Sequence, residues 1–92
     1  MDLKVTSWII HKPLHFKMRE VLLIRLEAAG FDIFSGTRSH QSSVRFPYIC
    51  YSPGYKIYSA NETAANDKSY KFEKVEYEYV MDELEKIIKN EN

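Results

Sequence analysis

Carboxylates are concentrated near the C-terminal end of a chain that has no net charge. Residues 1–59 carry eight Lys/Arg and four Asp/Glu, a formal charge of +4, whereas residues 60–92 carry five Lys/Arg and nine Asp/Glu, a formal charge of −4. Six carboxylates and a single lysine lie between residues 73 and 85. These carboxylates are Glu73, Glu76, Glu78, Asp82, Glu83 and Glu85. A row of this kind could bind the cationic side chains with which a partner protein contacts nucleic-acid phosphates.

The spacing of such a row is comparable to that of nucleic-acid phosphates. Carboxylates on one face of a helix are separated by about 4.5–6 Å along its axis, and same-face groups of a strand by about 6.5 Å. One strand of DNA offers a phosphate about every 3.4 Å. The alternative is a solvated helix face, because acids are favoured near a helix N-terminus. Asp82 and Glu85 can also pair with Lys86 and Lys89 at helical spacing.

A second pattern combines basic and aromatic side chains in the middle of the chain. Basic groups among aromatic rings on a sheet suit a binder of single-stranded nucleic acid, which needs partners for phosphates and surfaces for stacking. The alternative is a small core filled with tyrosines whose hydroxyls reach water. The residues concerned are Arg38, His40, Arg45 and Lys56 with Phe46, Tyr48, Tyr51, Tyr55 and Tyr58.

Patterns typical of enzymes and metal sites are weak or absent in this sequence. His11 and His15 have a spacing that can bind metal on a helix, but Pro13 lies between them and no third ligand is evident. There is no nucleophile elbow, P-loop or glycine-rich dinucleotide motif. We therefore expect no catalytic activity, no metal and no cofactor.

The elements that would position these residues form an α+β pattern. Residues 3–10 are rich in β-branched and aromatic types and predict an interior strand. The expected order is β-α-β-β-β-(β)-α, a small mixed or antiparallel sheet packed with two helices. Its members are a strand at 3–10, a helix at 13–29, strands at 31–36, 44–52 and 55–60, a strand-like start at 70, and a helix from about 79. Polar loops are expected at 37–43 and 61–69.

Individual residues refine this pattern. Gly30 is expected to end the first helix. Pro47 cannot donate a ladder hydrogen bond, so strand 44–52 is expected at an edge or with a bulge. Pro53-Gly54 predicts the turn of a hairpin. The opening strand–helix–strand favours a parallel pair, with an antiparallel arrangement also open.

The two predicted helices differ in their outer faces. Met18, Leu22, Leu26 and Ala29 predict the buried face of the first helix, and Val80, Leu84, Ile87 and Ile88 that of the last. Ile24 lies among charged residues on the opposite face of the first helix, with Phe16 beside it. These two residues are either scattered exposed apolar groups or a self-association patch.

The length of 92 residues predicts one domain, residues 1–92, with little surplus core. Cys50 is the single cysteine, which indicates a reducing compartment. The longest apolar run is Val21 to Ile24, so we expect no membrane segment and a cytoplasmic location.

The whole chain resembles the small anti-restriction nuclease proteins of T-even bacteriophages, a family of DNA mimics. The resemblance rests on the length, the opening MDLKVTSWII, the hairpin FPYICYSPGYKIYSA and the acidic close VEYEYVMDELEKIIKN. It implies an early bacteriophage protein of the host cytoplasm that evades host defence by inhibition. The implied partner is the host restriction endonuclease McrBC, with nucleoid proteins as further targets. The carboxylates present here, from Glu73 to Glu85, would imitate the phosphates.

The resemblance also implies a homodimer, which would double the length of the charged surface. Phe16 and Ile24 would suit the dimer interface. DNA mimics are usually strongly acidic, whereas this chain is neutral. Mimicry therefore requires the cations to lie on the opposite side of the molecule or at the dimer interface.

Overall fold

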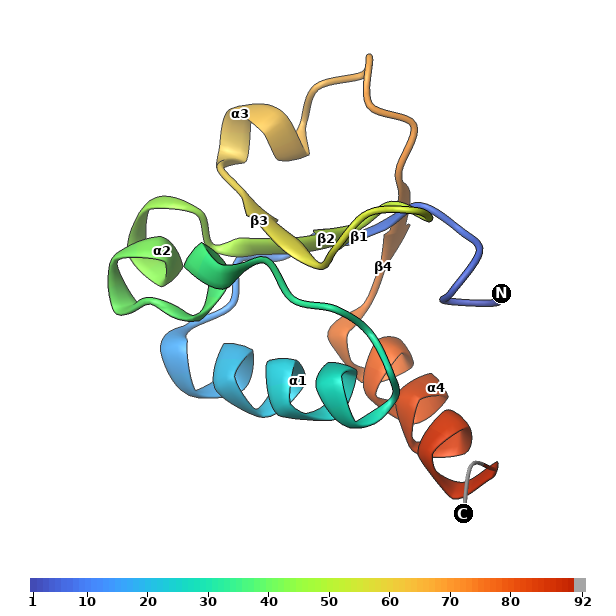
Figure 1. Cartoon of the computed structure of the whole chain (residues 1–92). Coiled ribbons are helices and arrows are strands. Elements are labelled where there is room, and N and C mark those ends of the chain that lie inside the picture. Colours follow the sequence, from blue (N-terminus) through green and yellow to red (C-terminus); the bar gives the residue numbers. More distant parts are fainter. Residues whose placement is uncertain (91–92) are drawn as a thin grey trace.

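The computed structural model describes residues 1–90, apart from the side chain of His40, and shows an α+β fold (Figure 1). A four-stranded mixed sheet has the order β3-β2-β1-β4. β1 pairs antiparallel with β2 and parallel with β4, and β2 pairs antiparallel with β3. The strands are β1 (Trp8–Ile10), β2 (Tyr48–Tyr51), β3 (Tyr58–Ala60) and β4 (Glu73–Val75). The predicted fold class is therefore confirmed, and β1 is an interior strand as expected.

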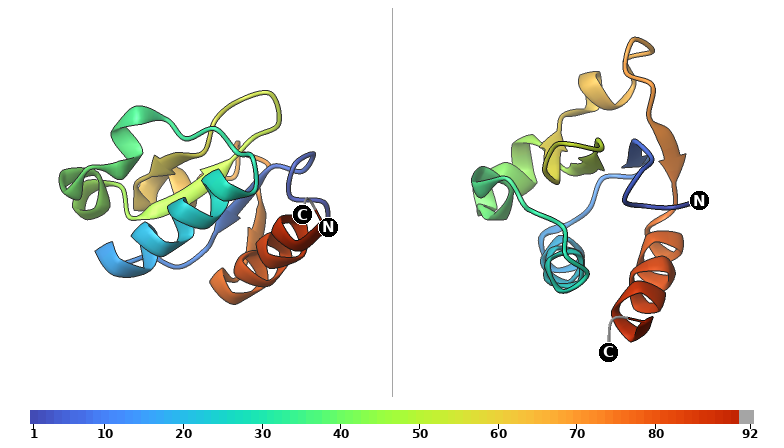
Figure 2. Two further views of the ribbon diagram at one scale, coloured as in Figure 1. Left: turned by 60° about the horizontal axis from the view of Figure 1, so that its bottom comes forward. Right: turned by 45° about the vertical axis from the view of Figure 1, so that its right-hand side comes forward.

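The main helices lie together on one face of this sheet (Figures 1 and 2). They are α1 (Phe16–Ala28) and α4 (Tyr77–Asn90). The remaining helical elements are short: η1 (Ser35–Arg38), α2 (His40–Arg45) and α3 (Glu62–Ala65). In Figure 1, α3 and the segment leading to β4 lie on the face opposite α1 and α4, while η1 and α2 lie beyond β3.

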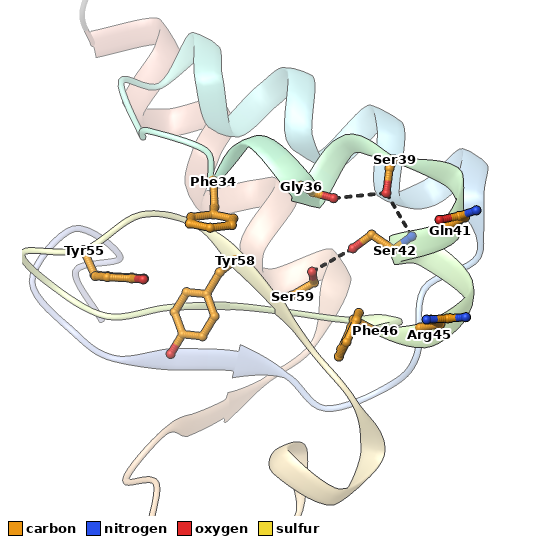
Figure 3. A pocket seen from close by; sticks show the side chains of 10 residues that line it. All are labelled: Phe34, Gly36, Ser39, Gln41, Ser42, Arg45, Phe46, Tyr55, Tyr58 and Ser59. Atoms are coloured by element: carbon orange, nitrogen blue, oxygen red, sulfur yellow. Dashed lines mark hydrogen bonds between the residues drawn. The ribbon is translucent and has the colours of Figure 1, made fainter.

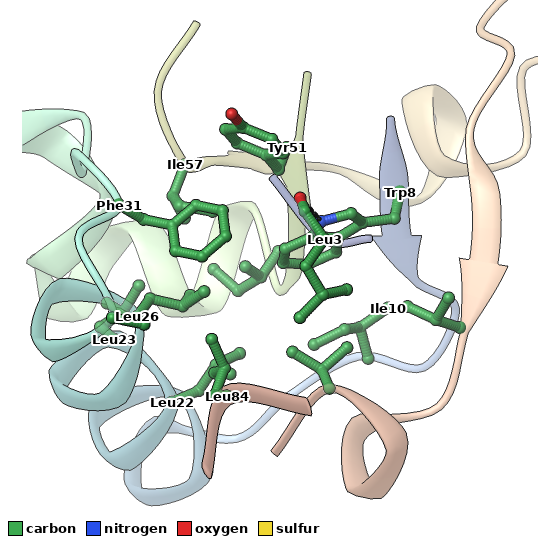
Figure 4. Packing of buried hydrophobic residues seen from close by; sticks show 14 of the residues in the cluster. Leu3, Trp8, Ile10, Leu22, Leu23, Leu26, Phe31, Tyr51, Ile57 and Leu84 are labelled. Atoms are coloured by element: carbon green, nitrogen blue, oxygen red, sulfur yellow. Dashed lines mark hydrogen bonds between the residues drawn. The ribbon is translucent and has the colours of Figure 1, made fainter. Parts of the chain in front are cut away.

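The principal core fills the space between the sheet and the two long helices (Figure 4). Strand alternation directs Trp8 and Ile10 into this core and Ile9 to the other face. The predicted helix faces are confirmed: Leu22 and Leu26 on α1 and Leu84 on α4 are all 0 % exposed. The second face has a smaller cluster, made chiefly of Ile9, Tyr48, Cys50 and Ala60.

The first predicted strand is shorter than its pattern suggested. Strand β1 starts only at Trp8, because the indole Nε1 donates a hydrogen bond to the carbonyl of Leu3 at 3.0 Å, which holds residues 3–7 in a turn. The first helix begins at Phe16 rather than Pro13, with His15 as its N-cap. Gly30 follows it with φ +94°, a conformation that favours glycine, as expected.

The predicted strand at 31–36 is wrong. Only the bridge between Ile33 and Ile57 forms, parallel, with two backbone hydrogen bonds of 2.8 Å each. From Ser35 the chain turns into η1, and the predicted loop 37–43 is largely helical because Ser39 caps α2 by accepting from the amide of Ser42 at 3.0 Å. The parallel pair of the sheet is β1 with β4 instead.

Two further expectations need correction in the second half of the chain. Strand β2 is an interior strand, not an edge strand. Pro47 lies just before the strand, so its missing N–H removes no ladder hydrogen bond. The carbonyl of Pro47 accepts from the amide of Leu14 at 2.9 Å. The connector 61–69 contains α3, which is capped by Asn61. The hairpin of β2 and β3 and the strand at β4 are confirmed.

One buried cation joins α1 to the elements beyond β3. The side chain of Arg19 is 2 % exposed. Its Nε and Nη2 donate to the carbonyl of Thr37 at 3.0 and 2.8 Å, and its Nη1 donates to the carbonyl of Phe46 at 2.7 Å. Nη2 also donates to Ser42 Oγ at 3.0 Å. Four of the five guanidinium N–H groups are thereby used.

Replacement of Arg19 by alanine should lower the free energy of unfolding by roughly 2–4 kcal/mol, because it leaves buried acceptors without donors. Urea denaturation measures the change. The matched control is Arg25→Ala, an exposed arginine of the same helix, for which we expect a change within about 0.5 kcal/mol. Equal stability losses in the two variants would contradict the role assigned to Arg19.

Candidate binding surfaces

The six predicted carboxylates are divided among three places. Glu73 is exposed on the edge strand β4, and Glu76 is exposed just before α4. Glu78, Asp82 and Glu85 follow one another at helical spacing on the outward face of α4. Glu83 lies on the flank of the helix, with its side chain only 24 % exposed. The outward row therefore has three members on α4, followed by Lys89.

Half of the six carboxylates have cationic or histidine partners. Glu76 Oε1 lies 2.6 Å from His11 Nε2, Glu83 Oε1 lies 3.3 Å from Lys86 Nζ, and Glu85 Oε1 lies 3.0 Å from Lys89 Nζ. The hydrogen bond from His11 lowers the pKa of Glu76, and that from Lys89 lowers the pKa of Glu85. Within residues 1–90, Glu73, Glu78 and Asp82 have no ion pair. The anionic row is thus interrupted by cations.

The two residues expected at a dimer interface are both on the surface of α1. Phe16 is 41 % exposed and Ile24 is 57 % exposed. Val21, 45 % exposed, adds a third apolar side chain to this helix surface. Their exposure is compatible with either reading of the sequence, and self-association stays a prediction.

The basic and aromatic residues of the hairpin are not gathered on one surface. Tyr48 and Tyr51 are buried in the two cores, as expected for core tyrosines. Arg38 Nη2 pairs with Glu27 Oε2 of α1 at 2.6 Å. His40 belongs to α2, but its side chain lies outside the described part of the structure. Lys56 is exposed. The remaining members line one hollow: Arg45, Phe46, Tyr55 and Tyr58.

The hollow lies between β3 and the η1–α2 segment and has a volume of about 420 Å³ (Figure 3). This is within the usual range for small-molecule sites, about 300–1,000 Å³. Three of its aromatic side chains are well exposed: Phe34 at 47 %, Phe46 at 40 % and Tyr55 at 58 %. Tyr58 lies against Tyr55 edge to face, with ring centroids 5.4 Å apart. We call this site the aromatic hollow.

Hydroxyl groups line the side of the aromatic hollow nearest α2. Ser42 Oγ and Ser59 Oγ are 2.9 Å apart, and Ser42 Oγ also accepts from the buried Arg19. Ser39 Oγ donates to the carbonyl of Gly36 at 3.2 Å. Arg45 lines the hollow as an exposed cation, and within residues 1–90 it has no ion pair or side-chain hydrogen bond.

Two smaller hollows adjoin this site and extend over the face of the sheet that carries Ile9 and Cys50. The second, of about 160 Å³, shares Phe46, Tyr58 and Ser59 with the aromatic hollow. The third, of about 80 Å³, shares Tyr70 and Phe72 with the second. The rings of Tyr58 and Phe72 are 6.5 Å apart, and those of Tyr70 and Phe72 are 5.9 Å apart and nearly parallel. We call the three hollows together the aromatic groove.

Charges at the far end of the aromatic groove are mixed. Lys68 and Lys74 line the third hollow together with Asp67. The Asp67 carboxylate accepts hydrogen bonds from the amide and hydroxyl of Ser69 at 2.9 and 2.7 Å, which lower its pKa. The groove therefore carries three cations, counting Arg45, and one carboxylate engaged with its own loop.

Reasoning from the sequence found only part of this groove. It identified Arg45, Phe46, Tyr55 and Tyr58, but missed Phe34 because residues 31–36 were expected to form a strand. Of the serines in the hollow, Ser39 and Ser42 belong to the predicted loop 37–43, and Ser59 belongs to the predicted strand 55–60. The sequence signal for α2 is Ser39, a residue type that favours the N-cap position, where its hydroxyl accepts from the amide of Ser42.

His11 and His15 each have a protein partner instead of a shared metal-ligand geometry. His11 pairs with Glu76, and His15 Nδ1 accepts from the amide of Met18 at 3.5 Å as the cap of α1. Among the described residues there is no group of three or more His, Cys, Asp or Glu that could hold a metal ion.

Comparison with protein-family models, with curated proteins and with solved structures finds no match to this chain. No helix within residues 1–90 has the length and apolar character needed to cross a membrane.

Cys50 should be unreactive in the folded protein. It is 0 % exposed, and burial raises the pKa of its thiol to about 12. The thiol donates to the carbonyl of Tyr58 at 3.5 Å. Because the thiolate is the nucleophile, alkylation by iodoacetamide at pH 8 should be slow in buffer and fast in urea. Mass spectrometry follows the reaction, with free cysteine as the reference. Rapid alkylation of the native protein would contradict this burial.

Proposed function

We propose that this protein binds single-stranded nucleic acid in the aromatic groove. The observation that carries the proposal is the cluster of exposed rings, Phe34, Phe46 and Tyr55, around a hollow that also holds the unpaired cation Arg45. Large apolar side chains exposed together are unusual on a small soluble domain and are typical of binding sites. Rings beside a free guanidinium suit a ligand with flat bases and phosphates.

The continuity of the groove supports a strand rather than one nucleotide. Each hollow shares aromatic residues with the next, so rings are available for bases over the whole path. Cations are present at both ends: Arg45 at one, and Lys68 and Lys74 at the other. A duplex keeps its bases stacked inside, where these rings could not reach them, so the unpaired strand is the expected ligand.

The proposal predicts binding of an oligonucleotide such as a fluorescent dT oligomer, measured by anisotropy. Phe34→Ala and Tyr55→Ala should each weaken binding by about 1–3 kcal/mol, roughly 5- to 150-fold, because each removes a stacking surface. The matched control is Phe16→Ala, an equally exposed aromatic on α1, which should leave the affinity unchanged.

Salt dependence provides a second readout of the same experiment. With three cations and one carboxylate in the groove, the slope of log K against log salt should lie between about −1 and −2. Equal losses in Phe16→Ala and Phe34→Ala, or no binding at low salt, would overturn the proposal.

Inhibition by DNA mimicry is the second candidate function. Three carboxylates on the outward face of α4, Glu78, Asp82 and Glu85, favour it. In this proposal the protein occupies the DNA-binding cleft of a restriction endonuclease of the McrBC type or of a nucleoid protein. Glu78 and Asp82 are unpaired among the described residues, whereas Glu85 is engaged by Lys89, so the row is short.

Mimicry predicts that the variant Glu78→Gln, Asp82→Asn, Glu85→Gln loses inhibition of McrBC cleavage in vitro while keeping its fold, as judged by circular dichroism. Electrostatic attraction between these carboxylates and a cationic DNA-binding cleft speeds association, so inhibition should also weaken as the salt concentration rises. The control removes three exposed carboxylates elsewhere, Glu20→Gln, Glu27→Gln and Glu62→Gln, and should still inhibit. Inhibition that survives in the first variant, or is absent from the unaltered protein, excludes this function.

A further inference from the structure

The buried guanidinium of Arg19 has no acidic partner. Its acceptors are two carbonyl oxygens and one hydroxyl, and within residues 1–90 it forms no ion pair. Burial lowers its pKa from the ordinary value by penalising the charged form, yet an arginine remains charged in proteins. A positive charge that is only dipole-solvated therefore lies directly behind Ser42, which lines the aromatic hollow.

The hydroxyl pair in front of Arg19 has one O–H group without an acceptor. Ser42 Oγ accepts from Arg19 and is 2.9 Å from Ser59 Oγ, and either hydroxyl could be the donor in that pair. Each hydroxyl has one proton. One proton is used between the two oxygens, and no other protein acceptor is found for the second among the described residues. The pair is completed only by an acceptor from outside the protein.

The direction of polarisation favours an anionic acceptor. Donation from a cation to Ser42 makes the Ser42 hydroxyl a better donor toward Ser59, and the Ser59 hydroxyl in turn a better donor toward the hollow. Hydrogen bonds in which one partner is ionised are about twice as strong as neutral ones. Arg45 lines the same hollow as a second donor, and its guanidinium has no ion pair or hydrogen bond to the described residues. Figure 3 shows Ser42, Ser59 and Arg45 on the side of the hollow formed by α2 and β3.

We propose that Ser42, Ser59 and Arg45 form a phosphate subsite within the aromatic hollow, with Arg19 as the positioning residue behind it. The inference rests on the proposed binding of single-stranded nucleic acid and specifies where its backbone lies. One phosphate of the strand accepts from Ser59 and from the Arg45 guanidinium. The adjoining bases lie on Phe34 and Tyr55 across the hollow.

Oligonucleotides with and without backbone charge test this subsite. The probes are a dT phosphodiester oligomer and the matching methylphosphonate oligomer, which keeps the bases but lacks the charge. The unaltered protein should bind the phosphodiester more tightly. Ser59→Ala should weaken phosphodiester binding by about tenfold or more, as expected for a lost hydrogen bond to a charged group. It should leave methylphosphonate binding nearly unchanged.

Two further variants separate the subsite from a general effect on the fold. Ser59→Thr keeps the hydroxyl on a residue that strands favour, and it should restore phosphodiester affinity. Ser7→Ala removes a half-buried hydroxyl that lines none of the hollows, and it should change neither affinity.

The possible outcomes distinguish the subsite from the proposed function. Equal effects of Ser59→Ala on both oligomers, or no effect on either, would overturn the phosphate subsite while leaving base stacking in the groove intact. Equal binding of the two oligomers by the unaltered protein would do the same. Failure of both oligomers to bind would overturn the proposed function and the subsite together.

Discussion

The hydrogen bonds of Arg19 join helix α1 to the surface beyond β3. A guanidinium taken out of water without a carboxylate must be matched by dipoles, and here the carbonyls of Thr37 and Phe46 supply them. Thr37 lies within η1 and Phe46 directly follows α2, so the two carbonyls lie on either side of α2. The requirements of a single side chain on α1 thus hold residues 37–46 in place, and with them the wall of the aromatic hollow.

The rest of the fold explains why the open surface lies on that side. The two long helices lie on one face of the sheet (Figure 1), and Trp8 and Ile49, which are directed there, are fully buried. A chain of this size has little further structure with which to cover the second face. The four residues of α3 and the ring of Phe72 do so only in part. The aromatic side chains between them therefore stay accessible in shallow hollows.

The sequence predicted those parts of the fold that depend on periodicity and missed those that depend on one distant contact. The faces of α1 and α4 follow from apolar spacing, and the hairpin follows from Pro53-Gly54 between β-forming segments. Residues 31–36 have the composition of a strand, but the chain pairs only through the Ile33–Ile57 bridge and then enters η1, where the Thr37 carbonyl accepts from the distant Arg19. Nothing in the spacing of Arg19 signals this contact. The sequence therefore predicts the groove residues in and just before the hairpin but not Phe34.

A neutral total charge does not argue against binding of a polyanion in the groove. Helix α4, which carries Glu78, Asp82 and Glu85, lies on the opposite side of the sheet from α3 (Figures 1 and 2). The smallest extent of the molecule is 22 Å, whereas the Debye length at physiological ionic strength is about 8 Å. An anionic ligand in the groove would therefore respond chiefly to the local charges of Arg45, Lys68, Lys74 and Asp67. By the same reasoning, a cationic partner at α4 would respond chiefly to Glu78 and Asp82, which have no ion pair within residues 1–90.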